Sequence, residues 1–138
     1  MTEQEFRQHL TQLGYHGDKV RIVNVEPMSE DDLATCTAKE DECFFNSYMN
    51  VIYGKGERYV LGYRGETPPV DHAIIRKGEQ YFDPTLQEND PNFAGYQYAI
   101  LAEFQVFDMM KHAKSNKDFP PDVDYLKKKK KNFKNVIA

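Results

Sequence analysis

The chain contains no tryptophan, only two cysteines, and no apolar run near the roughly 18–20 residues that a membrane span needs. Cys36 and Cys43 are too few for a disulfide framework, and they do not form a zinc pattern. A reducing cytoplasm is therefore the expected location. Residues 1–5 have neither a basic flank nor an apolar stretch, so we expect no secretory signal and no membrane partner.

Positive charge is outweighed by negative charge, with 18 Lys and Arg against 22 Asp and Glu and a net charge of −4. Nucleic-acid binders are usually basic, so nucleic acid is not the expected partner. The basic run Lys127–Lys131, with Lys134, is interpreted as a solvated helix face. The alternative is contact with an acidic partner or nucleic acid. Aromatic residues are plentiful, with nine Tyr and nine Phe, and 138 residues suffice for one domain with a core.

The pattern of apolar residues, caps and turn residues predicts alternating helices and strands. Thr2 and Glu5 have the spacing of a capping box. The expected helices cover residues 3–13, 41–53, 103–112 and 122–135, with a helical turn at 29–33. The expected strands cover residues 20–25, 58–64, 70–76, 80–83 and 96–101. This order predicts a single α+β domain with an antiparallel sheet, a core within about 20–112 and a lysine-rich C-terminal helix in 120–138.

The helix expected from residue 41 or 42 carries the most informative residues. Its apolar side chains form one broad face, made by Phe44, Phe45, Tyr48, Val51 and Ile52. Cys43, Asn46 and Asn50 share a different face, and Cys43 falls in the first turn. The Cys43 side chain therefore lies where the helix presents free backbone N–H groups.

A hairpin is predicted to bring His72 close to Asp83. If Lys77 and Gly78 are the central residues of its turn, the numbers of opposed residues sum to 155, and His72 faces Asp83 on one face of the sheet. Their Cβ atoms are then about 4.5–5.5 Å apart, which one hydrogen bond can bridge. A loop of three or five residues puts the two on opposite faces instead.

These residue types suit nucleophilic catalysis. A cysteine attacks as the thiolate, which a helix N-terminus and a neighbouring imidazolium both favour. His72 would shuttle the proton, and Asp83 would hold the imidazole in one tautomer. The chemistry would be attack on an acyl carbon, a thioester, and transfer to water or an amine. The backbone N–H of Cys43 is one oxyanion donor. Glu40, Asp41 and Glu42 oppose a nearby thiolate, most strongly if Glu42 is buried.

Four segments together resemble small transglutaminase-like proteins of the papain-like cysteine-hydrolase group: residues 42–47 (ECFFNS), 59–63 (YVLGY), 69–74 (PVDHAI) and 81–85 (YFDPT). The resemblance implies a papain-like fold and a Cys43, His72 and Asp83 triad, with no cofactor and a peptide or protein substrate. Small members of this group occur in bacteria and their phages, so a phage protein would act in the host cytoplasm. The group includes peptidases, deamidases, acyltransferases, cross-linking enzymes and inactive members.

Other interpretations stay open at this point. Cys43 is alternatively a buried small hydrophobe, half of a disulfide with Cys36, or a zinc ligand with His72 and Asp83. Asn46 is interpreted as structural support that bonds loop backbone, or else as a substrate contact. Tyr63 is interpreted as sheet packing or as part of a cleft. The main alternative function is an inactive papain-like scaffold that binds a protein, such as a phage factor that blocks a host protein. Residues 93–107 and the lysine run would form its surface.

Overall fold

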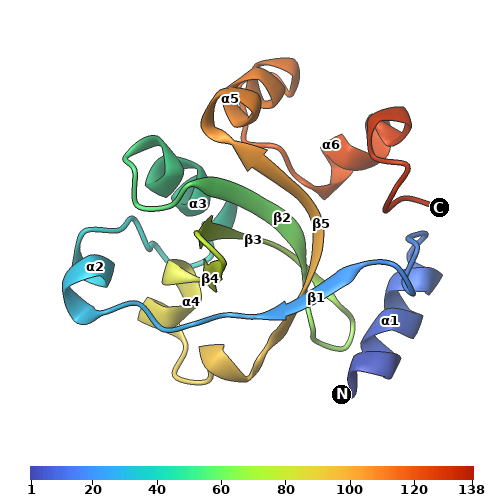
Figure 1. The fold of residues 1–138 in the computed structure, drawn as a ribbon, viewed down its shortest axis with the longest axis horizontal. Coiled ribbons are helices and arrows are strands. Elements are labelled where there is room, and N and C mark those ends of the chain that lie inside the picture. The colour runs from blue at the N-terminus through green and yellow to red at the C-terminus, as the bar shows by residue number, and fades with distance from the viewer.

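The computed structural model describes all residues, 1–138, and has the predicted α+β class. Its five strands form one antiparallel sheet in the order β1-β5-β2-β3-β4. They are β1 (Arg21–Asn24), β2 (Arg58–Arg64), β3 (Val70–Lys77), β4 (Gln80–Phe82) and β5 (Gln97–Gln105). The sheet curls, and helices surround it (Figure 1).

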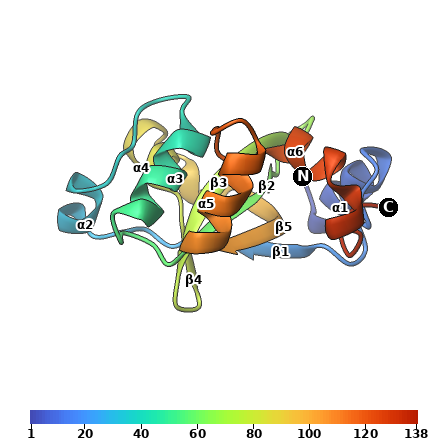
Figure 2. The same cartoon turned by 90° about the horizontal axis from the view of Figure 1, so that it is seen from above.

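The helices are short, and no helix is both long and apolar enough to span a membrane. They are α1 (Glu3–Gln12), α2 (Glu30–Ala34), α3 (Cys43–Ile52), α4 (Pro84–Asn89), α5 (Val106–Ser115) and α6 (Val123–Lys128), with 3-10 turns η1 (Phe93–Gly95) and η2 (Lys130–Asn132). The predicted capping box opens α1, since Thr2 and Glu5 exchange both side-chain to backbone hydrogen bonds. Figure 2 shows α3 beside α5 and places α2 and α1 at opposite ends of the molecule.

The core extends beyond the expected residues 20–112. Its larger cluster includes Phe6 and Leu10 of α1 as well as Val136 and Ile137 near the C-terminus. Backbone hydrogen bonds join the two ends of the chain: the His16 N–H donates to the Val136 carbonyl over 2.8 Å. The chain ends are therefore part of the packed body. A smaller cluster lies on the opposite face of the sheet, formed by Val25, Val60, Ile74, Tyr81, Tyr98 and Ile100.

Two predicted boundaries in the second half of the chain are wrong. The strand expected to end at 101 continues to Gln105, because Phe104 pairs with Tyr59 of β2 and is buried. The following helix therefore starts at Val106, and Phe107 is left 83% exposed. A helical spacing of aromatic residues was misleading here, since the first of them belongs to the strand.

The C-terminal lysine-rich helix is also shorter than expected. It ends at Lys128, and a 3-10 turn follows, so the chain can fold back and bury Val136 and Ile137. In addition, the segment after β4 is a helix, α4, that the sequence analysis did not predict. Asp83 is its N-cap and Pro84 its first residue, which is a favourable start for a helix.

The hairpin register differs from the predicted one by two positions. Lys77 pairs with Gln80 and Arg76 with Tyr81, so opposed numbers sum to 157 and the central residues are Gly78 and Glu79. Gly78 has φ +60°, which fits a turn that needs glycine at its first central position. Lysine is a poor residue for that conformation, and this explains why the turn is displaced. A shift of two preserves which face each side chain occupies.

Candidate active site

Cys43 lies in the first turn of α3, as predicted, and is the first residue of that helix, which starts one or two residues later than expected. Its backbone N–H donates to no backbone carbonyl, which is the expected state of a group at a helix start. The turn before it contains Asp41 in the left-handed region, with φ 62°. Glu42 is not buried: its carboxylate lies 3.5 Å from the Lys39 ammonium, in a partly exposed pair. The acidic run before Cys43 therefore faces solvent, where screening weakens its effect on the sulfur.

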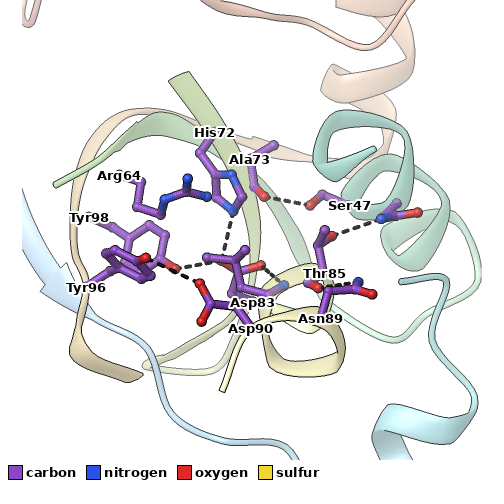
Figure 3. Close-up of polar contacts among 12 residues, drawn as sticks. Ser47, Arg64, His72, Ala73, Asp83, Thr85, Asn89, Asp90, Tyr96 and Tyr98 are labelled. Atoms are coloured by element: carbon purple, nitrogen blue, oxygen red, sulfur yellow. Dashed lines mark hydrogen bonds and ion pairs between the residues drawn. The ribbon is translucent and has the colours of Figure 1, made fainter. Parts of the chain in front are cut away.

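The predicted apolar face of α3 packs on the core only in part: Val51 is buried and Phe44 and Tyr48 pack against the core cluster. Cys43, Asn46, Ser47, Asn50 and Val51 are buried, while Phe45 is 51% exposed. The buried polar side chains all find partners. For example, the Ser47 hydroxyl donates to the Ala73 carbonyl of β3 over 3.0 Å (Figure 3). Hydrogen bonding thus acts together with apolar packing in setting how α3 lies on the sheet.

Two asparagines of α3 hold the loop that leads into Cys43. Asn50 accepts from the Thr37 N–H over 2.7 Å and donates to the Thr37 carbonyl over 2.9 Å. Asn46 donates to the Lys39 carbonyl over 2.7 Å and to the Thr85 hydroxyl over 2.9 Å. Asn46 therefore makes the loop-backbone contact expected of a structural support, and it also ties α3 to α4.

His72 and Asp83 are in contact. His72 Nε2 lies 2.8 Å from Asp83 Oδ2, and the two side chains are 4% and 0% exposed (Figure 3). In the observed register the pair is diagonal rather than directly opposed, and long side chains span that separation. Asp83 Oδ1 accepts the Leu86 N–H over 3.1 Å as the cap of α4. Both carboxylate oxygens of Asp83 therefore take part in hydrogen bonds, which fix the orientation of the group.

A third donor to Asp83, Tyr98, was not predicted from the sequence. The Tyr98 hydroxyl donates to Asp83 Oδ2 over 2.6 Å, from the β5 side of His72 (Figure 3). Gly62 belongs to β2, the strand between β3 and β5, and it lies opposite His72. A Cβ atom at position 62 would lie 1.7 Å from the Ala99 carbonyl oxygen. A β-bulge at this point draws β5 close to β2. No local pattern encodes this contact, because it depends on the long-range register of β5.

The environment of His72 favours its charged form. Burial lowers its pKa, but the negative charge and hydrogen bond of Asp83, together with the adjacent Cys43 side chain, raise the pKa from 6.5 to about 9. Because Nε2 is engaged by Asp83, Nδ1 is the ring nitrogen left for Cys43. The ring is therefore held by a carboxylate on one side, and Cys43 lines the same cavity as the ring.

Cys43 and His72 line the same cavity, of about 200 Å³, and Cys43 is 9% exposed. A second cavity of about 260 Å³ shares Asp41, Arg64, Thr85 and Leu86 with it, so the two form one groove. Arg64 stacks on the Tyr96 ring and pairs with Glu66, while Asp41 and Asp71 have no cationic partner. A larger cavity, of about 620 Å³, lies by the start of α5 but contains no cysteine or histidine.

The remaining predictions concern Tyr63, a disulfide between Cys36 and Cys43, and a metal site. Tyr63 is buried in the larger core cluster, and its hydroxyl lies 3.1 Å from that of Tyr15, so it is not a cleft residue. Cys36 and Cys43 are both free thiols. No group of three or more His, Cys, Asp or Glu side chains is arranged to hold a metal ion.

Comparisons with models of protein families, with curated proteins and with solved structures find no match for this chain. The resemblance to transglutaminase-like proteins therefore stays a prediction. The function has to be inferred from the geometry of Cys43, His72 and Asp83.

Proposed function

We propose that this protein is a thiol-dependent hydrolase or acyltransferase that acts on an amide, with Cys43 as nucleophile. The observation that carries the proposal is the position of the His72 ring. One of its nitrogens bonds a fully buried carboxylate, and the ring shares a cavity with the only thiol at a helix start in the chain. Buried, hydrogen-bonded polar groups that converge on a cavity are typical of a catalytic site.

The first half of the reaction forms a thioester. The Cys43 thiolate attacks the amide carbonyl carbon, and the oxygen that becomes negative is stabilised by the free Cys43 N–H. The C–N bond then breaks, and the His72 imidazolium gives its proton to the departing nitrogen. A raised His72 pKa, of about 9, supplies the protonated ring at neutral pH.

The second half releases the acyl group. Neutral His72 takes a proton from water, or from an amine, as that nucleophile attacks the thioester carbon. The C–S bond breaks and the sulfur leaves as thiolate, so His72 and Cys43 return to their starting charges. Water gives a carboxylic acid, and an amine gives a new amide. Asp83 keeps the ring in place in both halves.

We further propose that the scaffold is papain-like and of the transglutaminase-like type. The support is the order of the parts: a helix that starts at Cys43, then a strand carrying His72, then Asp83 directly after the next strand. The groove of two small cavities suits an extended peptide or a protein side chain better than a large ligand. A peptide amide or a glutamine side chain is the proposed substrate class.

Acylation by p-nitrophenyl acetate tests the proposal without a known substrate. We expect a burst of p-nitrophenol, an acetyl group on Cys43 detected by mass spectrometry, and faster labelling of Cys43 by iodoacetamide at pH 6–7 than of free cysteine. Cys43→Ala and His72→Ala should abolish the burst while the circular dichroism spectrum is retained. Cys36→Ala is the matched control and should behave like the wild type. Labelling of Cys43 no faster than free cysteine would contradict the proposal.

A protein-binding scaffold without activity is the second candidate, and one observation favours it. Phe45 of α3 and Phe107 of α5 are exposed, on two helices that lie beside each other (Figure 2). Exposed aromatic side chains are enriched in protein interfaces. A binding partner retained by Cys43→Ala but lost by Phe107→Ser, with no acetylation of Cys43 in the wild type, would favour this function over the enzyme.

A further inference from the structure

Asp83 Oδ2 accepts two hydrogen bonds, one from His72 and one from Tyr98 (Figure 3). Tyr98 is 2% exposed, and its ring centroid is 5.8 Å from that of His72. Burial, and then the charge of Asp83, raises the pKa of Tyr98, so its hydroxyl stays protonated. An ionised carboxylate only accepts, hence Tyr98 is the donor.

Resting on the proposed function, we propose that Tyr98 is a positioning residue of this site, and that its hydroxyl sets how tightly His72 holds a proton. The Tyr98 hydrogen bond is strongest when Asp83 carries an uncompensated negative charge, that is, when His72 is neutral. Tyr98 therefore stabilises the neutral ring more than the charged one. It limits how far Asp83 can favour the imidazolium, and it leaves His72 able to act as a base in the second half of the reaction.

Several titratable or charged groups surround His72 or line its cavity. They come from each element around the ring: Cys43 of α3, Arg64 of β2, Asp83 after β4, Tyr98 of β5, and the cavity-lining carboxylates of Asp41 and Asp71. Arg64 is paired with Glu66, and Asp41 and Asp71 are exposed. Tyr98 is the one neutral donor that shares the same carboxylate oxygen with the ring.

The test measures the His72 pKa by NMR titration of its ring in Tyr98→Phe, which keeps the aromatic ring and removes the hydroxyl. We expect the pKa to rise by about half a unit or more. Tyr96→Phe is the matched control, because it removes a hydroxyl that donates to Asp90 over 3.2 Å and should leave His72 unchanged. In Asp83→Asn, adding Tyr98→Phe should have no further effect on the ring.

A second substitution keeps the test decisive if Tyr98→Phe does not fold. Replacement of Tyr98 by 3-fluorotyrosine makes the hydroxyl a stronger donor, and it should lower the His72 pKa. In either variant a lower melting temperature with an unchanged His72 pKa would overturn the proposal and leave Tyr98 a packing residue. Hydrolysis of acetyl-Cys43 requires neutral His72, so the midpoint of its pH–rate profile should shift in the same direction as the His72 pKa. If no acetyl-enzyme forms, the proposed function fails, while the ring titration still decides the role of Tyr98.

Discussion

Replacement of Asp83 by Asn should remove a pH dependence of stability that the buried His72–Asp83 pair creates. The folded protein holds the His72 proton with a pKa of about 9, against 6.5 in the unfolded chain. At about 1.4 kcal/mol per pKa unit, the difference is worth about 3 kcal/mol. Because the folded state binds the proton more tightly, this stability is complete below pH 6.5 and is lost as the pH rises towards 9.

In Asp83→Asn the carboxylate charge is absent, and burial alone lowers the pKa of His72 below 6.5. We therefore expect the variant to be less stable than the wild type by about 3 kcal/mol at pH 6, and the two free energies of unfolding to approach each other above pH 9. The assay is urea unfolding followed by circular dichroism from pH 6 to 9.5, since the chain has no tryptophan.

The matched control is Asp90→Asn, which loses a carboxylate that accepts the Tyr96 hydroxyl but touches no histidine. Its unfolding free energy should follow the wild-type pH profile. A wild-type profile that is flat between pH 6.5 and 9, or one that Asp83→Asn reproduces, would refute the reasoning. NMR titration of the His72 ring gives the same answer independently.

Three further predictions concern the surroundings of the site. Gly62→Ala should cost more than about 4 kcal/mol, because its Cβ would meet the Ala99 carbonyl; a melting temperature near that of the wild type contradicts this. Asn46→Ala should cost about 2 kcal/mol in urea unfolding, since it removes a buried hydrogen bond to the Thr85 hydroxyl and two to the Lys39 backbone. A cationic methanethiosulfonate should label Cys43 at least about fivefold faster than an anionic one at low salt, and Asp41→Asn should reduce the ratio; equal rates at low salt contradict the charge of the groove.

Local features of this fold were predictable, whereas distant contacts were not. The capping box at Thr2 and the place of Cys43 in the first turn of a helix depend on neighbouring residues, and both are found in the structure. The alternation of side chains put His72 and Asp83 on one face even though the predicted register was wrong, because the error was an even number of residues. Tyr98 could not be predicted, since its place depends on a bulge between two strands far apart in sequence.

The residues that α3 buries besides its apolar ones bear on function. The apolar periodicity of a helix predicts that its apolar stripe faces the core, and this would bury Phe45. The structure packs Phe44, Tyr48 and Val51 on the core but leaves Phe45 exposed. It also buries Asn46 and Asn50, whose hydrogen bonds fix the loop before Cys43. Apolar packing tolerates small slides of a helix, whereas a set of directional hydrogen bonds does not. An exposed Phe45 lowers the stabilisation that burial would give, and what the helix gains is a fixed position for Cys43 in the cavity that it shares with His72. A helix that served only as part of the core would have no need of that arrangement, so its orientation favours a site at Cys43.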